Sequence, residues 1–484
     1  MKPTLFGYGL TTKAIADKLG GGCTFFDDKC TTTYTDEAGN TIYPSSEFNP
    51  NKSNLEVTTP SLPPKHPLIQ SAKHLQSEYD YFLGRSEELG SRNDTELGRN
   101  EELGSRSEKT RSTQEQTSST SPITPHSSLL TPHSSLLTPH SSLLTPHSPL
   151  LTPTSYLLPP TSYLLPPTSP FPFTIWISGT NGKTTTTQML THLLEHKGAV
   201  AGGNIGTPLA ALNEDAPIWV LETSSFTLHH THRASPDIYL LLPITPDHLD
   251  WHGSKEAYEA DKLRPLRTMR EGELALVPKG LNLPQTDAYV VEYESNDFLC
   301  NYFDLDATKL NYKGAFLQDA LLSLAITKVL FDETDYTLLN TFTRDAHRQE
   351  EFYDAQGRLW VNDSKATNLD ATLQAIKTYQ DSPLHLIMGG DDKGVDLTSL
   401  FEALQGLNLT LYSVGKNQET LLALSKQYHI KSTPAHTIEN AVALVAKAHT
   451  KESIALLSPA AASLDQFSSY KQRGEVFMQN VKRL

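Results

Sequence analysis

Residues 173–188 read FTIWISGTNGKTTTTQ, and this stretch decides the fold of the chain. Residues 174–177 form a short apolar run rich in β-forming side chains, which is typical of a buried strand. The GTNG segment then favours a tight turn, because glycine and asparagine tolerate backbone angles that other residues avoid. The threonine run after Lys183 predicts a helix that extends to about Glu195.

A strand, a glycine-rich turn, a lysine and a threonine in this order predict a P-loop. Backbone N–H groups at the start of the helix would bind phosphate, and Lys183 would neutralise the outer phosphates. The Thr184 hydroxyl would ligate Mg²⁺. The longer GxxxxGK[ST] pattern is not met, since Ile177 stands where it needs glycine. The alternative is a chance turn before a helix, and the ordered series of elements argues against it.

The composition restricts the class of protein. With 484 residues the chain is long enough for two to four domains. A net charge of −15 argues against a nucleic-acid-binding or polybasic membrane protein. The odd number of cysteines, three, without zinc-site spacing predicts reduced thiols in a cytoplasmic protein. We expect no signal peptide and no membrane insertion, because no run of about 18 apolar residues occurs.

Residues 1–83 predict an N-terminal Rossmann-like domain. A GYGLTT turn follows the first strand, and the second strand ends at Asp27 and Asp28, as in a dinucleotide-binding unit. Thr12 stands at the third glycine of GxGxxG, so a nucleotide-diphosphate site and a plain strand–turn–helix unit remain alternatives to an NAD site. The predicted elements are strands at 4–6, 23–26 and 55–57, a helix at 14–19, and a second helix that ends near Tyr79.

Residues 84–170 consist of seven-residue units, first RSEELGS-like and then TPHSSLL-like. The first units carry too few apolar residues for a coiled-coil seam, and the second carry proline in every unit. Ordering a backbone costs roughly 1–2 kcal/mol per residue, which these units cannot offset by burial. We therefore predict a disordered insertion. It would serve either as a partner-binding tether or as a tolerated repeat expansion.

The segments 171–343 and 344–484 both alternate predicted strands and helices, and polar motifs follow the strands. Open α/β sheets place ligands at this edge. The metal candidates are Glu222, at a strand end, and His248, after the next strand, which is either a structural residue or a ligand. Lys262 by itself would be an ordinary surface lysine. The predicted elements are strands at 218–221, 238–242, 359–361, 384–388, 409–414 and 453–457, a helix from Ser254 to Pro265 and an amphipathic helix beyond Leu317.

Seven motifs together resemble the Mur ligases, and among them the members that add D-glutamate to UDP-N-acetylmuramoyl-L-alanine. NDSKATN and the block that contains SLDQF are the most specific of these motifs. The resemblance covers about 400 residues, everything except the repeats. The motifs are GTNGKT (179–184), LETSSFTL (221–228), TPDHLD (245–250), HR (347–348), NDSKATN (362–368), GGDDKG (389–394) and SPAAASLDQFSSYKQRG (458–474).

The resemblance implies an α/β fold of three domains: a Rossmann-like domain for the UDP substrate, a central P-loop ATPase with a mostly parallel sheet, and a Rossmann-like domain for the amino acid. It implies that ATP is bound by Gly179, Thr180, Asn181, Gly182, Lys183, Thr184, Thr185, Arg348 and Asp363. Mg²⁺ would be held by Thr184, Glu222, His248 and a carbamylated Lys262. The catalytic residues would be Lys183, His248, Lys262 and Lys365. The UDP-N-acetylmuramoyl-L-alanine site would contain Leu10, Thr11, Asp28, Lys29, Thr59 and Asn204, and D-glutamate would meet Lys365, Thr367, Lys393, Ser463 and Tyr470.

The implied reaction transfers the γ-phosphoryl group of ATP to the carboxylate of UDP-N-acetylmuramoyl-L-alanine, and the amine of D-glutamate then attacks the acyl phosphate. The reaction would serve peptidoglycan precursor synthesis in the cytoplasm, and we expect a monomer. Several positions depart from the family pattern and put the adenine and uracil contacts in question: Asp28, Pro243, Trp251, Asp319 and Ala461.

Two alternatives remain open from the sequence. One is another ligase of the same superfamily, such as a folylpolyglutamate synthase, which would release phosphate with a different amino acid. The other is a binding protein without enzymatic activity, in which the repeats bind the partner.

Overall fold

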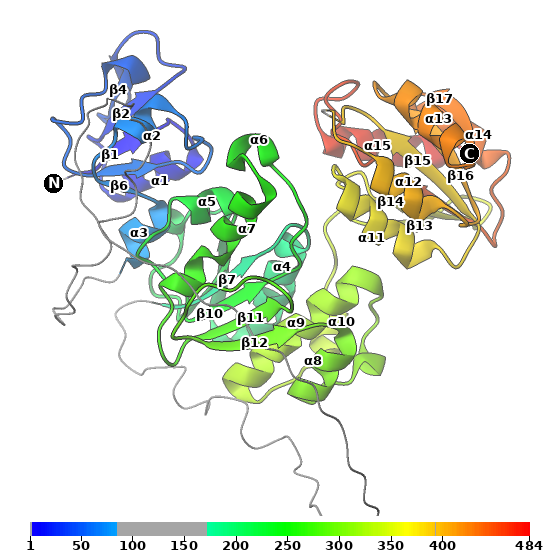
Figure 1. Ribbon diagram of the computed structural model, residues 1–484, viewed down its shortest axis with the longest axis horizontal. Helices are drawn as coiled ribbons and strands as arrows, with labels where there is room; N and C mark the ends of the chain where they lie inside the picture. The colour runs from blue at the N-terminus through cyan, green and yellow to red at the C-terminus, as the bar shows by residue number, and fades with distance from the viewer. Residues whose placement is uncertain (1, 85–171, 393) are drawn as a thin grey trace, which may run out of the picture. The chain divides into compact units, whose positions relative to one another are not determined.

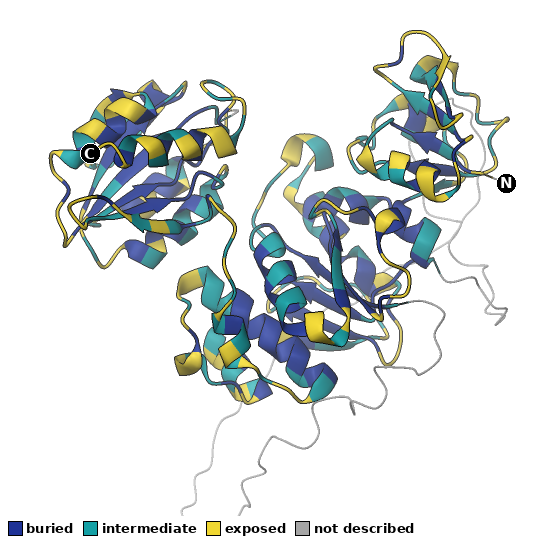
Figure 2. Cartoon of the chain, turned by 180° about the vertical axis from the view of Figure 1, so that it is seen from behind, coloured by how far each residue is buried: buried dark blue, intermediate teal, exposed yellow. Residues whose placement is uncertain are grey.

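The computed structural model describes residues 2–84, 172–392 and 394–484, and the predicted insertion lies outside these ranges except for Gly84. The described chain forms three six-stranded sheets flanked by helices (Figure 1), which confirms the predicted α/β class. Most residues of the strands are buried, whereas exposed residues gather on the outer sides of helices and in loops (Figure 2).

The central sheet has the strand order β12-β11-β10-β7-β9-β8, and all of its described pairs are parallel. The P-loop strand β7 therefore lies inside the sheet, between β9 and β10. Each residue of β7 is buried, as its run of apolar residues predicts. The strands are β7 (Phe173–Ser178), β8 (Ala199–Gly203), β9 (Ile218–Glu222), β10 (Ile238–Leu241), β11 (Leu274–Pro278) and β12 (Tyr289–Tyr293).

Helices cover both faces of the central sheet. On one face α4 packs beside α9, and the shared core includes Leu190 and Leu321. The other face is covered by α3, α7 and the short helix η4, around Trp176 and Leu209. The elements on the two faces and at the edges are α4 (Lys183–Leu194), η3 (Glu195–Lys197), η4 (Leu209–Ala211), α5 (Ser225–His229), α6 (Leu249–His252), α7 (Lys255–Leu263), η5 (Arg264–Arg267), α8 (Asn296–Phe303), η6 (Ala307–Lys309), α9 (Gly314–Phe331) and α10 (Tyr336–Asn340).

The prediction of an amphipathic helix beyond Leu317 is wrong in two respects. The helix α9 already begins at Gly314, and from Asp319 to Leu330 all but one of its residues are buried. A helix enclosed on nearly all sides needs no polar stripe toward solvent, which explains its mostly apolar composition. By length and composition α9 is also the one described helix that could cross a membrane, yet its buried residues pack into the central core.

The N-terminal sheet has the order β3-β4-β2-β1-β5-β6, parallel except for the β3–β4 pair. The predicted helix that ends near Tyr79 is wrong, because the chain becomes extended at Ala72 and forms the edge strand β6. The elements are β1 (Thr4–Phe6), α1 (Leu10–Lys18), β2 (Thr24–Asp27), β3 (Tyr34–Thr35), β4 (Thr41–Pro44), η1 (Ser45–Glu47), β5 (Glu56–Thr58), α2 (Pro67–Ser71), β6 (Leu75–Gln76) and α3 (Glu78–Leu83).

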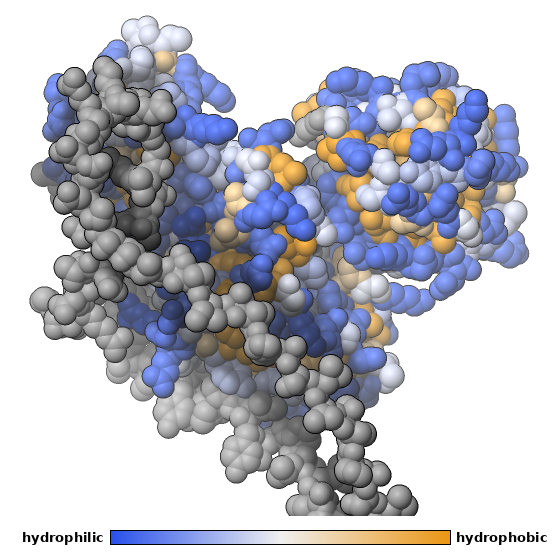
Figure 3. Space-filling model, viewed as in Figure 1, coloured by the Kyte–Doolittle hydropathy of each residue, from blue (hydrophilic) through white to orange (hydrophobic). Residues whose placement is uncertain are grey.

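The C-terminal sheet has the order β13-β14-β18-β15-β16-β17 and is parallel except for the β13–β14 pair. The four predicted strands of this segment are present. Hydrophilic residues occupy much of the face visible in Figure 3, with hydrophobic ones between them. The elements are β13 (Glu350–Tyr353), β14 (Leu359–Asn362), α11 (Leu369–Tyr379), β15 (Leu384–Gly389), α12 (Thr398–Leu404), β16 (Leu409–Val414), α13 (Gln418–Gln427), β17 (Lys431–His436), α14 (Ile438–Ala446), β18 (Ile454–Leu457) and α15 (Tyr470–Val481).

The helix α3 is fixed to the central core although it follows the N-terminal sheet in the chain. Tyr79 packs edge-on against Trp176, with ring centroids 4.8 Å apart. The buried Asp80 carboxylate accepts three backbone N–H bonds of 2.8 Å from residues 232–234. The chain thus leaves this core at the end of α3 and re-enters it at β7.

This anchoring predicts that residues 85–171 can be removed. We expect a chain in which a Gly/Ser linker of about 15 residues replaces them to keep kcat within about threefold, because loop closure costs only about 0.6 kcal/mol per doubling of length. Enzyme assay and thermal melting measure this. The matched control is Asp80→Ala in the full chain, which removes the buried acceptor of three N–H groups, the Ala234 N–H among them buried, and should lower the melting temperature. A deletion variant that loses activity or stability would show that the segment packs on the enzyme.

Glu78 on α3 predicts a pH-dependent stability. Burial raises the pKa of its carboxyl to about 7, against the hydrogen bonds from the Leu209 and Ala210 backbone. A raised folded-state pKa means that the stabilisation is complete below the unfolded value near 4.5 and is lost as the pH rises through about 7. Glu78→Gln should therefore stabilise the protein at pH 8.5, by at most about 3 kcal/mol, and change little at pH 5.

Thermal melting of both forms at pH 5 and 8.5 measures this difference. The exposed Glu47 provides the matched control, since Glu47→Gln makes the same chemical change outside the core. An equal effect of Glu78→Gln at both pH values would contradict the assignment.

Candidate functional site

A cavity of about 380 Å³ lies at the carboxyl end of the central sheet and joins most of the predicted nucleotide residues. Glu222 lies opposite Ile177 in the β7–β9 register, so its side chain stands beside the P-loop. From the C-terminal segment, Arg348, Asp363 and Lys365 reach the same cavity. The predicted residues that line it are Thr180, Asn181, Gly182, Lys183, Thr184, Thr185, Asn204, Glu222, His248, Arg348, Asp363, Lys365 and Thr367.

Two glycines are required by the tight path of the loop. Gly179 has φ +140°, and a Cβ there would lie 2.5 Å from the Leu242 Cβ. Gly182 has φ +83°, and a Cβ there would lie 2.8 Å from the Asp319 carboxylate. Side chains at either position would strain the backbone and meet a neighbour, so GTNG closes the turn as the sequence predicts.

Lys183 begins α4 and curls back over the loop. Its Nζ donates to the carbonyls of Gly179 (2.9 Å) and Thr180 (2.7 Å). Burial lowers the pKa of Lys183, while the Glu222 and Asp247 carboxylates oppose this shift. The ammonium is thus held among loop carbonyls at the position where a phosphate chain would meet it.

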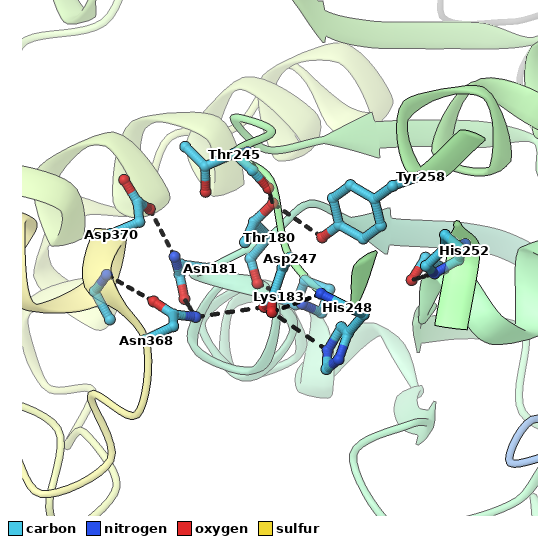
Figure 4. Close-up of polar contacts among 12 residues, drawn as sticks. Thr180, Asn181, Lys183, Thr245, Asp247, His248, His252, Tyr258, Asn368 and Asp370 are labelled. Atoms are coloured by element: carbon cyan, nitrogen blue, oxygen red, sulfur yellow. Dashed lines mark hydrogen bonds and ion pairs between the residues drawn. The ribbon is translucent and has the colours of Figure 1, made fainter. Parts of the chain in front are cut away.

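Side chains of neighbouring segments also hold the P-loop, through hydrogen bonds to Thr180 and Asn181 (Figure 4). The Thr180 hydroxyl lies 3.0 Å from the Tyr258 hydroxyl and donates to the Thr245 carbonyl (2.9 Å). The Asn181 side chain donates to the Asp370 carboxylate at the start of α11 (2.6 Å). These partners were not predicted from the sequence. The spacing of Tyr258 and Lys262 along one helix face could have indicated Tyr258.

Lys262 is not the surface lysine that its sequence context alone suggests. It is 1% exposed, and its Nζ donates to the Gly179 carbonyl (2.7 Å) and lies 4.8 Å from the centre of the Tyr258 ring. Burial, reinforced by the nearby Lys183, lowers its pKa well below the usual range. Lys262 therefore lies behind the loop and is not among the residues that line the cavity.

The metal residues fit Mg²⁺ only together with a phosphate chain. Within the described ranges, no three His, Cys, Asp or Glu side chains are grouped to hold a metal ion. The Glu222 Oε1 accepts from the Asn204 amide (2.8 Å), whereas its buried Oε2 has no hydrogen-bond partner. A carboxylate oxygen without a hydrogen-bond partner, on a residue that lines the same cavity as Thr184, suits an ion that is otherwise held by phosphate and water. Burial also lowers the pKa of His248, which favours the neutral, ligating imidazole.

Two buried carboxyl groups line the cavity, those of Asp363 and Asp319. Burial raises the pKa of Asp363 to about 7, against the hydrogen bonds from Ser458 and the Gln349 backbone. Burial likewise raises the pKa of Asp319 to about 7. Asp319 thus lies against the P-loop, at a position where the family pattern has asparagine.

The predicted D-glutamate residues are only partly brought together. Lys365 and Thr367 line the cavity, and the Lys365 Nζ lies 4.2 Å from the centre of the Tyr470 ring. Ser463 and Tyr470 are not among the lining residues, and Ser463 is buried. Lys393 lies outside the described residues. The buried Arg473 was not predicted; it donates to Ser364 and to the Ala461 carbonyl and so fixes the NDSK loop.

A second cavity, of about 340 Å³, lies at the carboxyl end of the N-terminal sheet. Asp28, Lys29 and Thr59 line it as predicted, but Leu10 and Thr11 do not, and Leu10 is 66% exposed at the start of α1. The Asp28 carboxylate lies 2.8 Å from His66 Nε2, and its pKa is lowered by hydrogen bonds from Ser45 and His66.

Comparisons with known proteins identify the family of the chain. The Mur ligase middle domain family matches residues 177–293. The UDP-N-acetylmuramoylalanine–D-glutamate ligase of Campylobacter jejuni (strain RM1221) is 40% identical over 100% of both chains. The chain belongs to this ligase family. The ligase of the same name from Helicobacter pylori (strain 26695) is 38% identical over 99% of this chain and 98% of its own. Among solved structures, a MurF ligase from Thermotoga maritima in complex with ADP covers 64% of this chain and 80% of its own, with 18% identity and a TM-score of 0.49.

The structure shows the surroundings of three positions at which this ligase departs from the family pattern. Trp251 packs among aromatic rings, 4.8 Å from Phe226 and 5.1 Å from His229. Pro243 accepts from the Thr180 N–H (3.2 Å) and so helps to close the P-loop. Asp28 is paired with His66. Each departure thus has a local partner in this chain.

Proposed function

We propose that the chain catalyses the ATP-dependent ligation of D-glutamate to UDP-N-acetylmuramoyl-L-alanine, as a step of peptidoglycan precursor synthesis. The observation that carries this proposal is the single cavity that joins the P-loop with Glu222, Arg348 and Lys365, in a chain whose full-length relatives bear this activity in their names.

ATP would bind with its phosphates against N–H groups of residues 181–185, since the Thr180 N–H donates to the Pro243 carbonyl. Lys183 would neutralise the γ-phosphoryl group, and Arg348 and Asp363 would contact the nucleotide. Mg²⁺, held by Thr184, Glu222 and His248, would supply further positive charge to the phosphates. Because both the ATP phosphates and the substrate carboxylate are anionic, cations at this point are needed to bring them together.

Phosphoryl transfer to the carboxylate would give an acyl phosphate, which the D-glutamate amine attacks. The tetrahedral adduct then collapses to an amide and inorganic phosphate. Lys365, beside Thr367, would attract the anionic amino acid, and Ser463, Tyr470 and Lys393 would complete its site. The N-terminal cavity would take the uridine diphosphate with Asp28, Lys29 and Thr59, and Leu10 and Thr11 would contribute from its rim.

The buried Lys262 supports carbamylation. A carbamate forms from a neutral amine, and burial favours the neutral amine of this lysine. The modification would place an anionic group near the predicted metal site.

We further propose a monomeric enzyme of the cytoplasm. Three cysteines without a disulfide among the described residues fit a reducing compartment.

The test measures phosphate release with ATP, UDP-N-acetylmuramoyl-L-alanine and one amino acid. Release is expected only with all three substrates, and with D-glutamate but not L-glutamate. Release with L-glutamate and a folate substrate would instead support a folylpolyglutamate synthase. Phosphate release that ignores the amino acid would refute both.

A further inference from the structure

A buried chain of three side chains connects the helices around the predicted metal site. The His252 Nδ1 lies 2.8 Å from the Asp261 carboxylate, and its Nε2 lies 3.0 Å from the Ser225 hydroxyl. The carboxylate can only accept, so Nδ1 carries the proton and donates to Asp261. In the neutral ring, Nε2 then accepts a hydrogen bond from the Ser225 hydroxyl. The three residues come from α5, α6 and α7.

The residue types of this arrangement resemble a nucleophilic triad, but its hydroxyl is closed off from substrate. The His252 side chain is fully buried, and Ser225 is 4% exposed. The His252 ring stacks on Phe226, with centroids 5.5 Å apart and planes at 9°, and it meets the Tyr258 ring edge-on at 5.1 Å. No substrate could reach the Ser225 hydroxyl in this packing. The role of these hydrogen bonds is therefore to hold the helices α5, α6 and α7 in place.

Two members of this chain, His252 and Asp261, border residues of the predicted metal site. His252 closes the short helix α6, whose first residue follows His248, and its N–H donates to the His248 carbonyl (3.1 Å). Asp261 precedes Lys262 on α7. Adjacent residues of a helix differ by about 100° in direction, so Asp261 can hold α6 while Lys262 reaches the Gly179 carbonyl.

Asp261 is the common anchor of these contacts. Its carboxylate also accepts from His229 Nδ1 (2.9 Å) and from the Arg264 guanidinium (2.8 Å). A buried carboxylate with three partners has a fixed orientation, because loss of any one of them leaves buried hydrogen-bonding capacity unmet. The rotation of α7 about its own axis, which sets the direction of Lys262, is fixed by the same contacts.

We propose that the Ser225–His252–Asp261 chain positions His248 and Lys262 at the P-loop, with His252 as the positioning residue that joins α6 to α7. This inference rests on the proposed function, since it assigns a task to residues outside the reacting atoms. The role predicts a loss in kcat with little change in the KM for ATP, because the P-loop contacts to the phosphates do not pass through His252.

Two substitutions separate the two hydrogen bonds of the ring. The amide of Asn in His252→Asn can replace Nδ1 and keep the bond to Asp261. In His252→Gln the amide lies one carbon further out. It can replace Nε2, so only the bond to Ser225 is kept. We expect kcat of His252→Gln to fall by about 10–100-fold, as for residues that orient metal ligands, and kcat of His252→Asn to stay at least tenfold above it. The KM for ATP should change by less than about threefold in both.

A readout besides turnover is the ¹³C resonance of a Lys262 carbamate in ¹³C-bicarbonate, which should weaken in His252→Gln and persist in His252→Asn. The matched control is His192→Gln, which makes the same change at a histidine whose Nε2 lies near the Leu338 carbonyl (3.2 Å) and the Thr341 hydroxyl (3.0 Å), away from α5, α6 and α7, and should leave kcat within about threefold. If the His252 variants do not fold, Asp261→Asn, which retains the shape of the carboxylate, should lower kcat in the same way.

Equal kcat in His252→Asn and His252→Gln, or wild-type kcat in Asp261→Asn, would overturn the inference. The wild-type enzyme is assayed beside them with D-glutamate. If it shows no D-glutamate-dependent turnover, the proposed function fails, and that failure is seen before any variant is compared.

Discussion

Lys183→Ala should abolish ATP turnover and leave the fold intact. The Lys183 Nζ contacts only two carbonyls of its own loop among the described hydrogen bonds, so its loss removes charge from the phosphate site without opening the core. Loss of one preorganised group that stabilises the transferred charge costs on the order of 10²–10³-fold in kcat. We expect at least this loss for Lys183, which would face the phosphoryl group itself.

Phosphate release measures the effect, and thermal melting verifies the fold. Lys197→Ala is the matched control, because Lys197 lies just past α4 in a surface ion pair with Glu333 (2.7 Å). Surface pairs of this kind contribute at most about 1 kcal/mol, so the control should retain activity. A folded Lys183→Ala protein with near-normal turnover would remove the P-loop assignment.

Lys262→Ala should also eliminate turnover, for a different reason. If Lys262 is carbamylated, the substitution removes an anionic group from a site that must hold divalent cations, and we expect a loss of at least about 100-fold. Acetate or a similar short carboxylic acid could enter the space left by the side chain and supply the missing oxygens. Partial recovery with acetate in Lys262→Ala, and none in Lys183→Ala, would support the carbamate.

A second variant distinguishes the loss of side-chain packing from the loss of the Lys262 carbamate. Lys262→Met keeps most of the aliphatic volume but cannot be carbamylated, so it should be as inactive as Lys262→Ala while melting at a higher temperature. The control is Lys255→Ala at the exposed start of the same helix, which should have almost no effect. Wild-type turnover in either Lys262 variant would contradict the assignment.

The P-loop could be predicted because its signal is local. A buried strand, residues that allow positive φ, and a lysine before a helix are adjacent in the sequence, and the structure places them as predicted. The N-cap at Ser254 is local in the same sense: the hydroxyl accepts from the Ala257 N–H (3.1 Å) and begins α7 where the sequence places it.

The burial of Lys262 could not be predicted in this way. It depends on Tyr258, four residues earlier on the helix, and on the Gly179 carbonyl, which is 83 positions away in the chain. Helical spacing indicates that Tyr258 and Lys262 share a face, but not that this face packs behind a P-loop. The contact between Asn181 and Asp370 depends likewise on two segments that only the folded chain brings together.

An edge strand and a core helix were also hard to predict from the sequence. The strand β8 reads AVAGG, and its glycines suggest a turn although parallel pairing with β9 holds it extended. In α9 the side chains are apolar on nearly every side, so periodicity locates neither its start nor its exposed face.

The central claim is that this site forms an acyl phosphate from the substrate carboxylate before the amide bond forms. The most direct test follows ¹⁸O from the labelled L-alanine carboxylate of UDP-N-acetylmuramoyl-L-alanine during turnover with ATP and D-glutamate. Attack of the carboxylate on the γ-phosphoryl group predicts one labelled oxygen in each phosphate released. Unlabelled phosphate, formed together with the amide product, would contradict the account.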